Sequence, residues 1–158
     1  MSGAGATNIV IGIAVVALLI VRQLRRQPVR ETSAARLMLI LGAIGVVEMI
    51  SASKKHPVGA SAVGLIALGL VLAAGFGIWR ALTVRLWRQP DGTAWRQGTA
   101  ATATLWIVAI ATHIVIDVII GDTDEGAAAV ASASILLYIA ISLGVQREVL
   151  RARAAKLA

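Results

Sequence analysis

The chain has 158 residues, of which 58% are hydrophobic and 15% charged, with a formal net charge of +7 and no cysteine. Disordered chains are poor in apolar residues, and disulfide scaffolds, cysteine zinc sites and dithiol electron carriers need sulfur, so these classes are excluded. The basic excess would indicate nucleic acid in a soluble protein, but soluble domains are only about 45–50% apolar. We therefore expect a membrane protein, with no nucleic-acid partner, whose cations face the cytoplasm and anionic lipid headgroups.

Five apolar runs are long enough, or nearly so, to cross a hydrocarbon core of roughly 30 Å, which takes about 17–25 helical residues. None shows the alternation of barrel strands, and in lipid a segment must satisfy its own backbone groups, so each run is expected to be a helix. The predicted fold class is all-α: one polytopic transmembrane bundle over residues 1–158. Its spans cover residues 4–21, 34–53, 58–79, 99–120 and 127–145.

Cations are divided unevenly between alternate connections. The first loop holds five Lys and Arg residues, the third loop four and the C-terminal tail four, thirteen in all, whereas the other two loops hold only Lys54 and Lys55. The first run has no Lys or Arg before Arg22 and no convincing cleavage site, so we expect it to be retained as an anchor. The positive-inside rule then predicts an external N-terminus and a cytoplasmic C-terminus.

Residues 83–98 connect the third and fourth predicted spans. Their Pro-Asp-Gly turn signal at 90–92 is flanked by short runs rich in Val, Thr and Trp, which predicts a cytoplasmic β-hairpin, or a tight loop, with Trp87 near Trp95. Trp and Arg together suit the headgroup layer. An interfacial anchor and a docking surface for a partner or anionic lipid both remain open. The candidate contact residues are Arg85, Trp87, Arg88, Trp95 and Arg96.

Three ionisable residues, Glu48, His113 and Asp117, stand well inside predicted spans. Such groups cost about 2.5–3.5 kcal/mol each on insertion scales, so they need a partner, a cavity or a function. At 100° per residue, Trp106, His113 and Asp117 share one narrow stripe with Thr102. His113 and Asp117 are four residues apart and can touch, and an imidazole beside a carboxylate is a general-base arrangement.

The fifth predicted span carries Ser134, Tyr138 and Ser142 at four-residue spacing, so polar groups on separate helices could converge on one pocket. In that case Glu48, His113 and Asp117 would be catalytic, with Trp106, Tyr138 and Ser134 in support. A structural polar network is the alternative. No metal or cofactor site is predicted, because these three ligands have no defined geometry and no glycine-rich phosphate motif is present.

Small residues indicate how the helices could pack. Gly69, Ala73 and Gly77 form a small-xxx-small series in the third predicted span, and the second predicted span contains the small residues Gly42 and Gly45. Such stripes let helix backbones approach closely in lipid, where packing replaces the hydrophobic effect.

Two segments, 24–30 (LRRQPVR) and 75–98 (GFGIWRALTVRLWRQPDGTAWRQG), resemble the CcdC family of small bacterial membrane proteins. An arginine-rich loop after the first helix and an Asp-Gly hairpin before a later span are typical of that family. In the span after the hairpin the family often has an Arg where this chain has His113. The resemblance implies a multi-pass protein of the bacterial cytoplasmic membrane, and it implies no reaction.

The function expected from the sequence is that of an accessory or partner-binding membrane protein. Its partners would be the bilayer, anionic headgroups, and a protein partner or a second copy of the chain. One alternative is an intramembrane acid–base enzyme, an isomerase or cyclase of a lipid-soluble substrate, that uses His113, Asp117 and Glu48. A second alternative is proton-coupled transport through the same three residues.

Overall fold

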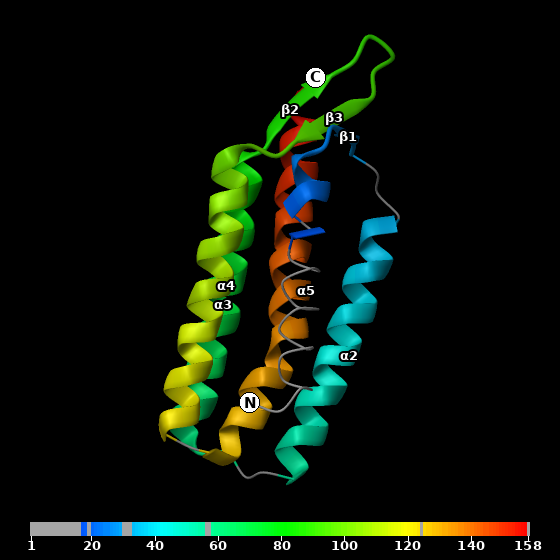
Figure 1. The fold of residues 1–158 in the computed structure, drawn as a ribbon. Helices are drawn as coiled ribbons and strands as arrows, with labels where there is room; N and C mark the ends of the chain where they lie inside the picture. Colours follow the sequence, from blue (N-terminus) through cyan, green and yellow to red (C-terminus); the bar gives the residue numbers. More distant parts are fainter. Residues whose placement is uncertain (1–16, 19, 30–32, 56–57, 124, 158) are drawn as a thin grey trace.

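The structure, a computed structural model, describes residues 17–18, 20–29, 33–55, 58–123 and 125–157 (Figure 1). It is mostly helical, with a small sheet at one end. The elements in chain order are β1 (Gln27–Pro28), α2 (Ser33–Lys55), α3 (Ala60–Thr83), β2 (Arg85–Arg88), β3 (Ala94–Gln97), α4 (Ala100–Thr123) and α5 (Glu125–Ala155).

Helix α5 is the centre of the bundle. It contacts each of the other three helices, while α3 and α4 also pack side by side and α2 packs mainly against α5. The chain reverses direction between successive helices, so β1, the hairpin β2–β3 and the end of α5 gather at one end (Figure 1). We call this end the sheet end. Lys54, Lys55 and Asp122 lie at the opposite end.

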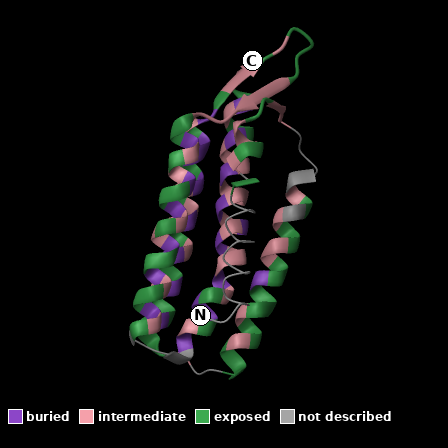
Figure 2. Ribbon diagram, viewed as in Figure 1, coloured by how far each residue is buried: buried purple, intermediate pink, exposed green. Residues whose placement is uncertain are grey.

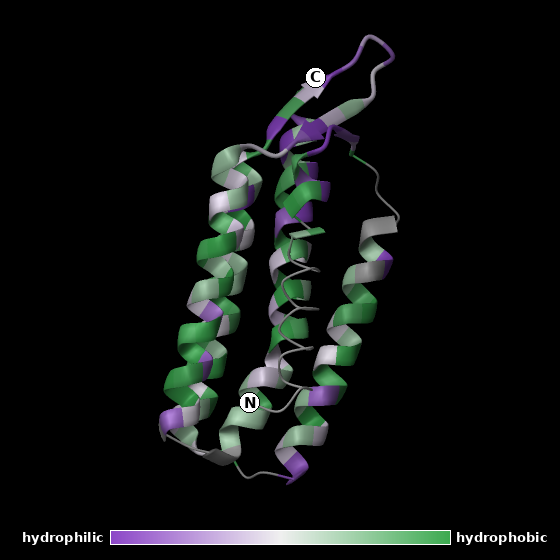
Figure 3. Cartoon of the chain, viewed as in Figure 1, coloured by the Kyte–Doolittle hydropathy of each residue, from purple (hydrophilic) through white to green (hydrophobic). Residues whose placement is uncertain are grey.

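Among the described residues, three helices are long and apolar enough to cross a membrane: α3, α4 and α5. Figure 3 shows their apolar middle sections and the hydrophilic residues that gather at the sheet end. Helix α2 is one residue shorter than α3 and α4 but is not one of the three, and it carries Arg36, Glu48 and two terminal lysines. Most of the first predicted span (4–21) lies outside the described residues.

Helix α5 is ten residues longer at its C-terminal end than the predicted span 127–145, because the basic tail continues the helix. The tail is amphipathic: Leu150 and Ala154 are buried, whereas Glu148 and Arg151 are exposed. Leu150 forms a small core with Ala81 of α3, against which the sheet packs. Packing of one apolar stripe therefore keeps a charged segment helical.

The predicted hairpin is confirmed. Strands β2 and β3 are antiparallel with Trp87 opposite Trp95, as expected. Gly92 takes the left-handed conformation that the turn requires (φ 80°). The carboxylate of Asp91 accepts a hydrogen bond from the backbone N–H of Thr93 (2.9 Å), which lowers the pKa of Asp91.

Strand β1 is the part of the sheet that the sequence did not predict. Its two residues pair with β3, Gln27 opposite Arg96 and Pro28 opposite Trp95, so that β3 is central in the order β1-β3-β2. The first loop is thereby joined to the connection between α3 and α4.

The small residues lie where helices approach most closely, as predicted. A Cβ added at Gly45 of α2 would lie 2.6 Å from the backbone nitrogen of Leu137, and one at Gly77 of α3 would lie 2.5 Å from the carbonyl oxygen of Ser142. Both partners are backbone atoms of α5. Because backbone cannot rotate away as a side chain can, glycine is required at both positions.

We predict that Gly77→Ala lowers thermal stability, since overpacking costs about 1–3 kcal/mol. Gly75→Ala is the matched control two residues away, because a Cβ there meets nothing within 4 Å. Both variants add one methyl group to the same helix. Circular dichroism during heating in detergent should show a lower midpoint for Gly77→Ala than for Gly75→Ala. Equal midpoints would contradict the close approach of α3 and α5.

Candidate functional site

A continuous polar core runs between α3, α4 and α5. The contributing residues on α4 are Thr102, Trp106 and His113, and those on α5 are Ser134, Tyr138, Ser142 and Gln146; all are buried. Those on α4, and Ser134, Tyr138 and Ser142 on α5, belong to the helix stripes that the sequence predicts, and Gln146 extends the α5 stripe by one turn. Figure 2 shows buried residues along the sides where these helices meet, and exposed residues on the outer faces.

His113 and Asp117 lie together, as their spacing predicts. Nε2 of His113 is 3.5 Å from Oδ2 of Asp117, a separation at which they form no hydrogen bond. The imidazole also lies against the ring of Tyr138, with centroids 4.8 Å apart. The Tyr138 hydroxyl donates a hydrogen bond to the carbonyl oxygen of Ala109 (2.9 Å), which ties α5 to α4.

These residues line a narrow furrow with about 200 Å³ of empty space. His113, Asp117, Ser134 and Tyr138 are its polar lining, and it is not wide enough at any point for a water molecule. Substrate pockets typically offer about 300–1,000 Å³ that a ligand can occupy, and this furrow offers no such space. In this conformation the furrow does not admit a lipid-soluble substrate.

Glu48, the third predicted catalytic residue, is exposed on α2 and does not line the furrow. Interhelical geometry decides this, because the rotation of α2 is set by the contact of Gly45 with α5. The predicted convergence thus joins α4 and α5 and leaves α2 out. Among the described residues, no group of three or more His, Cys, Asp or Glu could hold a metal ion.

Arg80 is the residue that sequence analysis misplaced. It was counted among the loop cations, but it lies in the last turn of α3 and is fully buried. Its guanidinium carbon lies 3.8 Å above the ring centroid of Trp106, and Nη2 donates a hydrogen bond to Oγ of Ser142 (2.5 Å). A signal was present: Arg80 follows Gly77 by three residues and so continues the small-residue face that packs on α5.

The sheet presents different residues on its two faces, because side chains alternate along a strand. Leu86 packs against the core at the end of α3 and α5, so its face points toward the helices. The paired positions Pro28, Trp95 and Trp87 form a row on the other face. Both Trp residues are half-buried, and Arg85 beside Trp87 is exposed. Of the predicted contact residues, Arg85, Trp87 and Trp95 therefore share this face, whereas Arg88 and Arg96 lie on the face of Leu86.

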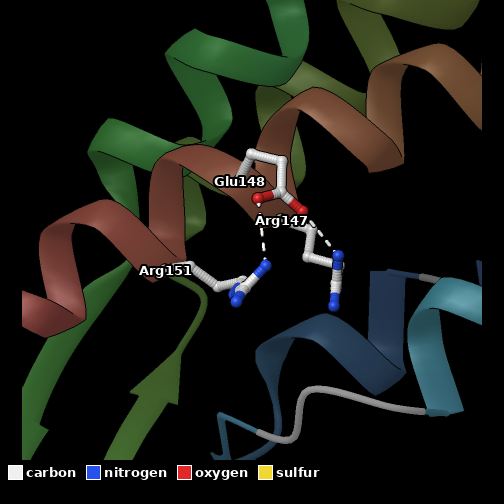
Figure 4. Close-up of polar contacts among 3 residues, drawn as sticks. All are labelled: Arg147, Glu148 and Arg151. Carbon is white, nitrogen blue, oxygen red and sulfur yellow. Dashed lines mark hydrogen bonds and ion pairs between the residues drawn. The ribbon is translucent and has the colours of Figure 1, made fainter.

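Positive charge is concentrated at the sheet end. Burial lowers the pKa of Arg96, and the positive charge of Arg22 lowers it further. Arg147 and Arg151 of α5 both contact the carboxylate of Glu148, at 2.5 and 3.2 Å (Figure 4). Arg153 donates hydrogen bonds to the carbonyl oxygens of Ala81 and Val84, where α3 ends. With Arg22, Arg25 and Arg26 also exposed, cations exceed acidic groups among the residues described at this end.

Comparison with known proteins identifies no relative: no family profile, no curated protein and no solved structure matches the chain. Its function must be argued from its own residues.

We predict that Tyr138→Phe destabilises the bundle by about 1 kcal/mol, because it removes the hydrogen bond between α5 and α4 while keeping the ring. Thr104→Val is the control, since the Thr104 hydroxyl is exposed and bonds only to the preceding turn of its own helix (3.2 Å). Equilibrium unfolding in mixed micelles measures both. A loss for Thr104→Val as large as for Tyr138→Phe would contradict this role of Tyr138.

Proposed function

We propose that the protein is a multi-pass protein of the bacterial cytoplasmic membrane, with five spans, an external N-terminus and a cytoplasmic sheet end. Three helices of sufficient length and hydropathy support this placement. So does the gathering of the first loop, the hairpin and the tail at one end, because the positive-inside rule assigns their cations, apart from the buried Arg80, to the cytoplasm. The resemblance to the CcdC family is in line with the same placement and stays a prediction.

Within that membrane we propose an accessory role, in which the sheet end docks onto an acidic surface of a partner protein. The observation that carries this proposal is the row of Pro28, Trp95 and Trp87, on the sheet face that does not pack on the helices. Trp and Arg are enriched at the energetic centres of protein interfaces. The basic surroundings select an acidic partner and speed its approach.

The direction of the hairpin favours a protein over the headgroup layer. Its turn extends beyond the ends of the helices (Figure 1), so with the helices across the membrane the turn stands away from the bilayer. An interfacial anchor would instead hold its Trp side chains at headgroup level. A protein on the cytoplasmic side can reach both the Trp row and the exposed Arg85.

We predict that a photo-crosslinking amino acid at Trp87, in native membranes, yields a discrete protein adduct. The double variant Arg85→Glu/Arg88→Glu should remove most of this adduct, because charge reversal opposes an acidic surface, and raised salt should weaken it by screening. Denaturing gels and mass spectrometry of the adduct provide the measurement.

The matched control is Lys54→Glu/Lys55→Glu, which reverses two exposed charges at the opposite end of the bundle. It should leave the adduct unchanged, as should Asp117→Asn. Adducts with lipid alone, or an adduct equally sensitive to both double variants, would refute the docking role.

A second function, proton exchange within the membrane, is favoured by the meeting of His113, Asp117 and Tyr138 at one furrow. The narrowness of the furrow argues against catalysis on a substrate, and the two titratable groups that meet there leave proton exchange as the alternative. Ionisable groups inside transmembrane segments commonly mark proton relays.

For this function we predict that Asp117→Asn abolishes proton flux in liposomes that contain the protein and a trapped pH-sensitive dye, because an amide cannot take up the proton. Asp122→Asn, on the same helix but exposed at its end, should retain the flux. If wild-type protein conducts no protons, or if both variants conduct equally, the relay does not exist.

A further inference from the structure

Among the described residues, Arg80 and Trp106 together have more buried side-chain nitrogen atoms without a hydrogen-bond partner than any other pair in contact. Nε and Nη1 of Arg80 and Nε1 of Trp106 are buried, and none of the three has a hydrogen-bond partner. A guanidinium has five N–H hydrogens, three of them on Nε and Nη1. Three N–H hydrogens of Arg80 on α3 and one of Trp106 on α4 are therefore unpaired. The two side chains are stacked, with the guanidinium carbon 3.8 Å from the centroid of the indole ring.

The positive charge of Arg80 is not matched by an acidic residue of the described chain. The ion pairs found there join His113 to Asp117, and Arg147 and Arg151 to Glu148. Asp117 is eleven residues beyond Trp106 on α4, which is about 16 Å along the helix. A buried charge without a partner costs several kcal/mol, so a negative group from outside the chain would be strongly favoured at this position.

The existing contacts of Arg80 leave the donors available. Ser142 accepts the hydrogen bond from Nη2 and uses its own hydrogen to bond the carbonyl oxygen of Ala73 (2.7 Å). At the end of α3, the carbonyl oxygens of Ala81 and Val84 accept hydrogen bonds from Arg153 instead. Neither interaction engages Nε or Nη1 of Arg80.

Hydroxyl groups lead from this pair toward the sheet end. Thr83 and Thr102 lie one turn from Arg80 and Trp106 respectively, and their hydroxyl oxygens are 2.9 Å apart. Thr102 in turn contacts the hydroxyl of Thr99 (3.3 Å), which is only half-buried. The concentration of arginines at this end attracts anions from solution and from the headgroup layer.

We propose that Arg80 and Trp106 form a binding site for a phosphate group, reached from the sheet end past the three threonines. The guanidinium matches the oxygens of a phosphate in geometry and charge, and the indole N–H adds a donor from the second helix. The phosphate is either inorganic or the headgroup phosphate of an anionic phospholipid. This site is separate from the docking surface and does not depend on it.

The experiment uses the full chain in neutral detergent and follows helix unfolding by circular dichroism. Inorganic phosphate, compared with chloride at equal ionic strength, should raise the unfolding midpoint of the wild type, because a ligand that binds the folded state stabilises it. Native mass spectrometry with phosphatidylglycerol and phosphatidylcholine tests the lipid source. A phosphate effect without retained phosphatidylglycerol identifies the free ion, and selective retention of phosphatidylglycerol identifies the headgroup.

Three variants decide whether the site is the one proposed. Arg80→Gln should abolish both effects, and Arg80→Lys and Trp106→Phe should each require about tenfold more phosphate, as expected for lost hydrogen bonds to a charged group. Arg80→Lys keeps the positive charge and Trp106→Phe keeps an aromatic ring. These two variants therefore test the site even if Arg80→Gln does not fold. Arg88→Gln, an exposed arginine of the sheet, should behave as the wild type.

The proposal is overturned if neither phosphate nor phosphatidylglycerol affects the wild type, or if Arg80→Lys and Trp106→Phe respond as the wild type does. Loss of the effect in Arg88→Gln alone would assign the phosphate to the sheet surface and also overturn it. Because the crosslinking at Trp87 and the phosphate effect use different residues, either proposal can fail without the other.

Discussion

The rotation of α5 about its own axis is the constraint on which the rest of the bundle depends. Its polar stripe must be buried, since Tyr138 and Ser142 find their acceptors on two different helices, at the carbonyl oxygens of Ala109 and Ala73. An unpaired hydroxyl in an apolar interior costs free energy comparable with a lost hydrogen bond. One rotation of α5 satisfies both groups at once.

Close packing makes that arrangement possible. Ser142 can reach a backbone carbonyl of α3 because Gly77 lets the two backbones approach, and Gly45 allows the same approach of α2 to α5. Polar bonds and small residues therefore act at the same interfaces. In lipid, where apolar surfaces gain little by associating, this combination supplies both affinity and a fixed register between helices.

Much of this fold could be predicted from the sequence, because length and hydropathy define helices and spacing defines their faces. The α4 stripe that ends at His113 and Asp117, and the α5 stripe through Tyr138, needed no knowledge of neighbours. Whether Glu48 faces α4 and α5 could not be predicted in the same way. Helical spacing shows which residues share a face of one helix, but it does not show which neighbouring helix that face meets. Contacts between helices decide where that face points.

Arg80 shows the other limit of sequence analysis. A cation at the end of an apolar run is ordinarily assigned to a loop, and that rule fails here because Trp106 and Ser142, from distant parts of the chain, surround the guanidinium. The helical tail of α5 and the two-residue strand β1 were missed for the same reason. Each is stabilised by partners far away in sequence, which local composition does not report.

The pairing of β1 with β3 makes the sheet a mechanical link. Helix α2 packs mainly against α5. The β1 segment, which precedes α2 in the chain, is nevertheless hydrogen-bonded to the connection between α3 and α4. A force that tilts the hairpin therefore also acts on β1, which lies five residues before α2 in the chain. A load applied to the sheet end would thus be shared between the segment that contains β1 and the connection between α3 and α4.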